Sequence, residues 1–161
     1  MLRNILAVIA GYIVMALVVM VGLTGAYFAL GADRAFEAGT YDVTILWIVV
    51  WAVASIVAAL VGGVLCAKIS KHSKGAVISL AILIGILGAG NVVFRMTAEA
   101  PSPEDQVRAS DTPNFEAMTK AQAPIWMYIT ESLIGVVGVV AGAAIVCPGC
   151  KKDDAGTGVD A

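Results

Sequence analysis

A single acidic side chain lies within a long apolar stretch near the end of the chain. Glu131 is the only charged residue between positions 125 and 147. An acid inside a membrane span costs about 2.5–3.5 kcal/mol at the bilayer centre and less near its edge, so we expect it to have a partner or a function. Asn91 and Arg95 are expected at a similar depth, and Tyr128 is expected to add a hydrogen bond.

Two kinds of chemistry fit an acid at this place. It can bind a proton or another cation as part of a transport path, or it can act as a polar clasp that fixes the packing of the third and fourth apolar stretches. Glu131 is single, lies close to the end of its stretch and has Arg95 as a candidate partner. We therefore favour the clasp and keep the transport site as the alternative.

A second group of reactive side chains follows the same stretch. Cys147 and Cys150 frame the tetrapeptide CPGC. This spacing can supply half of a zinc site, and Cys66 with His72 would complete four ligands from the same end of the bundle. A redox pair is a further alternative, although the dipole at a helix C-terminus opposes a thiolate. Proline and glycine after a helix also form a simple stop signal, which is the interpretation that we favour.

The elements that must position these residues are four apolar stretches, at 5–30, 43–67, 75–94 and 125–147. A helix needs about 20 residues to cross a hydrocarbon core about 30 Å thick, and backbone groups in lipid must satisfy one another. Of the 161 residues 60% are hydrophobic and 14% charged, whereas soluble domains have roughly 25% charged residues. The sequence predicts an all-α membrane protein with four transmembrane helices in one compact bundle, residues 1–147.

The placement of lysine and arginine predicts the orientation of this bundle. The short turn KISKHSK between the second and third stretches carries three lysines, and Arg3, Lys151 and Lys152 lie at the same end. Basic segments close to membrane spans stay on the cytoplasmic side, so both termini are expected in the cytoplasm. Trp47 and Trp51, at the opposite end, fit an aromatic belt with a role in anchoring alone.

Small residues recur along the stretches at intervals of four and three, which place them on one helix face. Such faces let helices approach closely in lipid, where the hydrophobic effect gives helices little reason to associate. In the fourth stretch the same spacing puts Glu131 on the glycine face, so we expect it to point into the bundle or toward a second copy. The predicted packing residues are Ser55, Ala59, Gly62, Gly85, Gly88, Gly135, Gly138 and Gly142.

Two polar segments lie outside the predicted spans. The loop 96–124, expected on the outer side, contains hydroxyl–proline pairs that are typical of helix starts. They predict short helices over 103–109 and 113–122 within a connector. The tail 148–161 is polar and glycine-containing, and we expect it to be disordered in the cytoplasm.

Two sequence segments carry a family resemblance. The opening RNILAVIAGYIV and the segment APIWMYIT, just before Glu131, resemble a group of small four-helix bacterial inner-membrane proteins that has no assigned activity. The resemblance implies a multi-pass protein of the inner membrane and supplies no catalytic residues.

The composition narrows the expected function. The net charge of −2 gives no basic patch, and no nucleic-acid motif is present. No Ser-His-Asp set or paired carboxylates point to a hydrolase. We expect a non-enzymatic structural or accessory subunit without a cofactor. Its expected partners are membrane lipid and either a second copy or another membrane protein.

Overall fold

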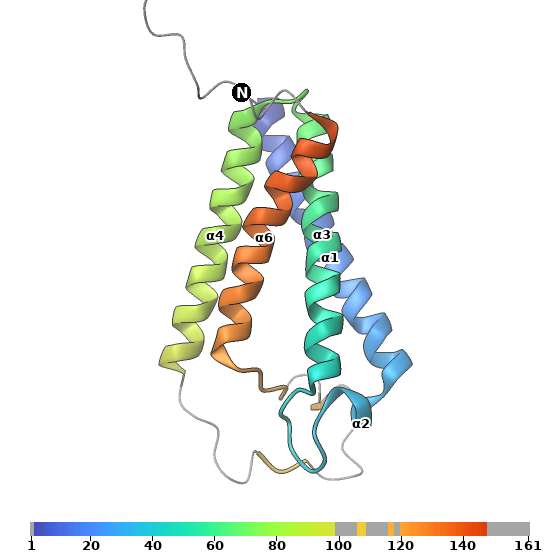
Figure 1. Cartoon of the computed structure of the whole chain (residues 1–161). Coiled ribbons are helices and arrows are strands. Elements are labelled where there is room, and N and C mark those ends of the chain that lie inside the picture. Colours follow the sequence, from blue (N-terminus) through green and yellow to red (C-terminus); the bar gives the residue numbers. More distant parts are fainter. Residues whose placement is uncertain (1, 99–105, 109–115, 118–119, 148–161) are drawn as a thin grey trace, which may run out of the picture.

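The bundle consists of four long helices that run side by side (Figure 1). The computed structural model describes residues 2–98, 106–108, 116–117 and 120–147. The helices are α1 (Leu2–Leu30), the short α2 (Ala32–Ala35), α3 (Ile45–Ile69), α4 (Lys74–Thr97) and α6 (Ile125–Val146). The four long helices are apolar enough to cross a membrane, and the described residues contain isolated β-bridges but no strand. The prediction of an all-helical bundle with four potential membrane spans is confirmed.

The two ends of the bundle differ in what they carry. The N-terminus, the turn between α3 and α4 and the end of α6 lie together at one end (Figure 1), called here the terminal end. The connections from α1 to α3 and from α4 to α6 lie at the other, called the loop end. At the terminal end the α3–α4 turn is closed by two left-handed residues, Lys71 (φ 54°) and His72 (φ 66°). The His72 N–H donates to the Ala67 carbonyl at 2.8 Å, which satisfies the end of α3.

Glycines on α6 set how closely this helix approaches two neighbours. Added Cβ atoms at Gly138 and Gly142 would overlap Ala59 and the Leu60 carbonyl of α3. Gly135 instead faces α4, where an added Cβ would lie 2.8 Å from the Ile84 side chain. The predicted glycine face of α6 is therefore divided between two partner helices.

The remaining predicted packing residues also lie at helix contacts. On α4, a Cβ at Gly88 would overlap Ser132 of α6, and one at Gly85 would lie 3.6 Å from Val136. On α3, Gly62 faces the side chain of Met15 in α1. Ser55 and Ala59 are buried on the same helix.

Helix α1 approaches α4 closely only toward its beginning. Asn4 Nδ2 donates to Ser73 Oγ at 3.2 Å, and a Cβ at Gly11 would lie 3.0 Å from the Leu80 side chain. Toward the loop end α1 leans away from α4 and α6 (Figure 1), and a Cβ at Gly25 would meet nothing within 4 Å. The helices therefore diverge along the half of the bundle that holds Glu131.

The connections at the loop end fold together into a small cap. Its buried residues are Tyr27, Ala35, Phe36, Tyr41, Val43, Trp47 and Ala117. Backbone bonds join the two connections, from the Arg108 N–H to the Gly39 carbonyl and from the Gln122 N–H to the Tyr41 carbonyl, both at 2.9 Å. The Arg108 guanidinium also pairs with Asp33 at 3.1 Å. The sequence did not predict this cap.

Of the two helices predicted in the loop 96–124, the one over 103–109 is interrupted at Val107, and the one over 113–122 is helical at 116–117 but has ended by Gln122. Val107 forms an isolated bridge with Thr40 rather than a helical turn, and Gln122 forms one with Asp42. Pairing with the first connection satisfies these backbone groups, so local helix propensity does not decide their conformation. Residues 116–117 are helical, whereas 103–105, 109–115 and 118–119 lie outside the described residues. The predicted tail 148–161 also lies outside them.

Candidate intramembrane binding site

Glu131 is held by a hydrogen bond from a different helix than the sequence suggested. The Trp51 indole Nε1–H donates to Glu131 Oε1 at 3.0 Å. Each residue lies six positions after the start of its helix, about 9 Å along the axis at a rise of about 1.5 Å per residue. The contact therefore clasps α6 to α3, not α6 to α4.

The candidate partners from α4 contact other groups. The Arg95 guanidinium carbon lies 5.1 Å from the centre of the Tyr128 ring, a cation–π contact. Among the described residues no ion pair to Glu131 and no hydrogen bond between Asn91 and Glu131 is present. The carboxylate thus has a hydrogen-bond donor but no compensating cation in the part of the chain that the structure describes.

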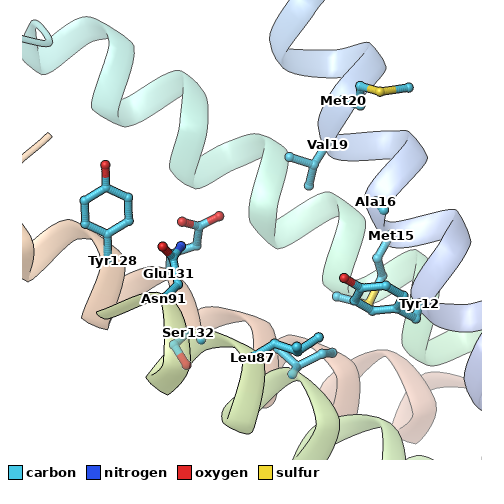
Figure 2. A pocket seen from close by; sticks show the side chains of 12 residues that line it. Tyr12, Met15, Ala16, Val19, Met20, Leu87, Asn91, Tyr128, Glu131 and Ser132 are labelled. Carbon is cyan, nitrogen blue, oxygen red and sulfur yellow. The ribbon is translucent and has the colours of Figure 1, made fainter. Parts of the chain in front are cut away.

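A cavity of about 420 Å³ opens beside Glu131 between α1, α4 and α6. Figure 2 shows α1 side chains on one wall and Asn91, Tyr128, Glu131 and Ser132 on the other. The predicted polar group is thus partly assembled, because three of its four members line this cavity and Arg95 does not. Tyr12 adds a fifth polar side chain from α1.

A smaller cavity of about 80 Å³ lies on the other side of Glu131, between α3 and α6. Trp51, Ser55 and Thr130 contribute polar groups to its lining. Ser55 is only 6% exposed, and its hydroxyl has no hydrogen-bond partner among the described residues. Buried hydroxyls are rarely left without a partner, and this cavity is large enough for ordered water, which needs about 10–15 Å³ of such volume. Glu131 therefore lies between the large cavity and a small, mostly apolar one.

Sequence reasoning missed the role of Trp51. The aromatic-belt interpretation took account only of its closeness to the span boundary. Trp51 lies eight residues into the predicted stretch 43–67 and Glu131 six into 125–147, and this similar depth was a usable signal, because residues at the same depth can meet across a bundle. The sequence contained no signal that α3 rather than α4 would face this side of α6.

The residues proposed for a zinc site do not come together as a set of three. Cys66 is a free, fully buried cysteine, His72 is exposed in the α3–α4 turn, and Cys147 is disulfide-bonded. Within the described residues no group of three or more His, Cys, Asp or Glu side chains could hold a metal ion. Cys150 lies outside the described residues.

Searches of protein-family models, curated proteins and solved structures find no match to this chain. Its function has to be argued from the geometry around Glu131.

Proposed function

We propose that this multi-pass membrane protein uses Glu131 as a cation-binding site within the membrane, with the proton as the simplest occupant. The observation that carries the proposal is that the carboxylate faces two cavities and has no ion-pair partner among the described residues. An uncompensated charge at this depth is costly, so the carboxyl group is either protonated or neutralised by a cation from outside the chain. Exchange between these two states is the elementary step of a cation-coupled transport element.

The residues around Glu131 support exchange at one group. Tyr12 from α1 and Tyr128 from α6 are the other titratable side chains that line the large cavity, and Arg95 of α4 lies over the Tyr128 ring. Helix α3 contributes the Trp51 indole and the Ser55 hydroxyl, neither of which ionises in the ordinary pH range. A pH response of Trp51 that disappears in Glu131→Gln would therefore originate at Glu131.

We assign no catalysed reaction to the site, because the two cavity linings offer one carboxylate without a second carboxylate, a histidine or a cysteine at its side. We place the protein in the bacterial inner membrane with both termini in the cytoplasm. The lysines of the α3–α4 turn support this orientation.

A structural clasp is the second candidate, and the hydrogen bond from Trp51 to Glu131 favours it. In that case the protein would be a structural or accessory subunit, and the bond would serve only to hold α3 against α6. The two candidates differ in one respect. A clasp needs an acceptor for the indole, whereas a cation site needs the negative charge.

Trp51 fluorescence can separate the two candidates. The chain has three tryptophans, so Trp47→Phe with Trp126→Phe leaves Trp51 as the single emitter. We would titrate the emission of this protein in phosphatidylglycerol nanodiscs with pH at several sodium concentrations and constant ionic strength, because salt alone changes the surface potential of this anionic lipid. In parallel we would titrate the variant that also carries Glu131→Gln. Glutamine keeps an acceptor for the indole but cannot ionise.

Cation exchange predicts that the midpoint of the pH titration falls as sodium rises, because sodium and protons compete for one carboxylate. The Glu131→Gln protein should show no titration in the same range. A Trp51 emission that shows no titration dependent on Glu131 would overturn the proposal and leave the clasp. A Glu131-dependent midpoint that stays fixed under sodium and under the organic cation tested below would restrict the occupant to the proton. A titration that persists in the Glu131→Gln protein would show that another group responds.

A further inference from the structure

The large cavity is open to the lipid rather than to water. Residues at its mouth are exposed on the bundle surface, Tyr12 by 40%, Leu87 by 46% and Met20 by 58%. Leu87 lies ten residues before the end of α4, about 15 Å from the loop end at about 1.5 Å per residue. In a bilayer with a hydrocarbon core about 30 Å thick, this depth is well inside the hydrocarbon. A ligand would reach Glu131 sideways, between α1 and α4.

The lining suits an organic cation better than a bare metal ion. Hard cations are held by several oxygen ligands at short range, six to eight for calcium. The large cavity offers one carboxylate, one amide and three hydroxyls, spread over α1, α4 and α6. Its volume of about 420 Å³ falls instead within the range of about 300–1,000 Å³ that is usual for organic ligands.

The same lining fits a molecule with one positive charge and an apolar body. Met15, Val19 and Met20 form an apolar wall on α1, and Leu87 extends it on α4. Methionine side chains adapt to ligands of different shape. Across the cavity from α1, Glu131 supplies the only negative charge of the lining (Figure 2).

We infer that the cavity between α1, α4 and α6 binds an amphiphilic organic cation from the membrane, with its ammonium group at Glu131 and its apolar part along α1. This inference rests on the proposed function and names the class of its cation. The ammonium group can belong to either of two kinds of molecule. One is a free alkylammonium compound, and the other is a lipid with an amine headgroup, such as phosphatidylethanolamine. Charge complementarity and the depth of the opening select this occupant over a neutral lipid chain.

The test measures binding of dodecyltrimethylammonium to the full chain with Trp51 as its single tryptophan. Phosphatidylglycerol nanodiscs are used because this lipid carries no ammonium group that would compete. Ligand at Glu131 perturbs the group that accepts the Trp51 hydrogen bond, so the emission of Trp51 reports occupancy. Dodecyl maltoside, which has the same chain without the charge, is the ligand control.

Two sets of variants test the charge and the cavity separately. Glu131→Gln removes the charge, and Ala16→Phe fills the cavity from α1. Ala16→Leu fills less of it and should give an intermediate effect. Ala89→Phe is the matched control, since it adds the same ring at an exposed position of α4 that does not line the cavity.

We expect Glu131→Gln and Ala16→Phe each to raise the half-saturating concentration at least tenfold, and Ala89→Phe to change it less than twofold. Replacing part of the phosphatidylglycerol with phosphatidylethanolamine distinguishes the two sources. A rightward shift of the binding curve that depends on Glu131 would assign the site to the lipid headgroup, and no shift would assign it to a free cation.

The failure of this inference can be told apart from the failure of the proposed function. If sodium shifts the Glu131 titration but dodecyltrimethylammonium does not bind, or if dodecyl maltoside binds equally well, the organic cation is overturned and the cation site stands. If neither of these cations nor the proton acts through Glu131, both are overturned. Equal effects of Ala16→Phe and Ala89→Phe would place the ligand outside the cavity.

Discussion

Trp51 and Glu131 meet from positions that are 80 residues apart in the chain. An indole N–H can only donate, and a carboxyl oxygen can accept in either protonation state. The bond can therefore persist while the carboxyl group gains or loses a proton, which is useful in a site that exchanges cations. The ring of Trp51 also packs edge-on against Tyr128, with centres 6.3 Å apart, so the indole is fixed from a second side.

A double-mutant cycle can measure the energy of this bond. Trp51→Phe removes the donor but keeps a ring beside Tyr128, and Glu131→Met removes the acceptor in a side chain of similar length. We expect a coupling energy of about 0.6–1.7 kcal/mol, the range found for hydrogen bonds between membrane helices. Reversible unfolding in mixed micelles would measure it for the four proteins. Additive effects of the two substitutions would show that the bond contributes nothing to stability.

Two adjacent glycines let α3 pack against different helices on different sides. Gly62 faces Met15 of α1, whereas Gly63 faces the Val139 carbonyl of α6. Membrane helices have no hydrophobic driving force to associate, and they gain packing energy where small residues let their backbones approach closely. The junction of α3 and α6 in turn determines where Trp51 can reach Glu131.

Gly63→Ala and Gly142→Ala should each destabilise the bundle by about 1–3 kcal/mol, the usual cost of overpacking. In both cases the new methyl group would overlap a backbone carbonyl of the facing helix, which cannot move like a flexible side chain. Gly90→Ala is the matched control on α4, because a Cβ there meets nothing within 4 Å. It should be neutral or stabilising by up to about 1 kcal/mol. Equal unfolding free energies for all three variants would contradict this packing.

The helices and their small-residue faces could be predicted from the sequence, but the partners of each face could not. Spacing by four and three relates residues of the same helix and carries no information about the helix opposite. The spacing therefore predicts one shared face for Gly135 and Gly138. In the structure Gly135 contacts α4, whereas Gly138 contacts α3. For the same reason the sequence did not predict Trp51 as the partner of Glu131, and Arg95 was the predicted partner instead.

The aromatic cap escaped prediction for a related reason. Phe36 contacts Tyr27 at 6.1 Å and Tyr41 at 6.4 Å between ring centres, and the Arg108 guanidinium lies 6.0 Å from its ring. These residues come from three separate segments with no shared periodicity. Short loops also lack the repeating pattern that identifies a span.

Phe36→Ala should open this cap while the four long helices stay formed. Phe36 is 2% exposed, and truncation of a buried phenylalanine costs about 3–5 kcal/mol. Hydrogen exchange of the backbone amides in residues 36–44 would report the loss as faster exchange. Phe94→Ala, at a ring that is 68% exposed on α4, is the control and should leave these amides protected. Unchanged protection in Phe36→Ala would mean that the cap does not depend on its central ring.

At the scale of the whole molecule, an even number of spans brings three chain segments to the terminal end. The Arg3 guanidinium donates to the Ser70 carbonyl at 3.4 Å, and Asn4 bonds Ser73, so the start of α1 is fixed to the α3–α4 turn. This arrangement concentrates Arg3 and the turn lysines at one end. At the other end the Arg108–Asp33 ion pair joins the two connections of the cap, and the Lys120–Glu116 pair lies within the second connection.

This asymmetry predicts that the terminal end faces the cytoplasm and the cap faces outward. Short segments rich in lysine or arginine resist transfer across the membrane, and this end holds Lys68, Lys71 and Lys74 beside the spans. Single cysteines at Ala38→Cys in the cap and Gly75→Cys at the start of α4 would test it without altering any charge. The background would carry Cys147→Ala and Cys150→Ala, and Cys66 can stay because it is fully buried.

In intact bacterial cells with a permeabilised outer membrane, a thiol reagent that cannot cross the inner membrane should label Ala38→Cys. Gly75→Cys should react only after the inner membrane is opened. The reverse pattern would mean that the aromatic cap lies in the cytoplasm and that lysine placement does not control this bundle. Labelling of both cysteines before the inner membrane is opened would indicate two orientations of the chain. A cation that enters sideways between α1 and α4 would then be released toward either side of the membrane.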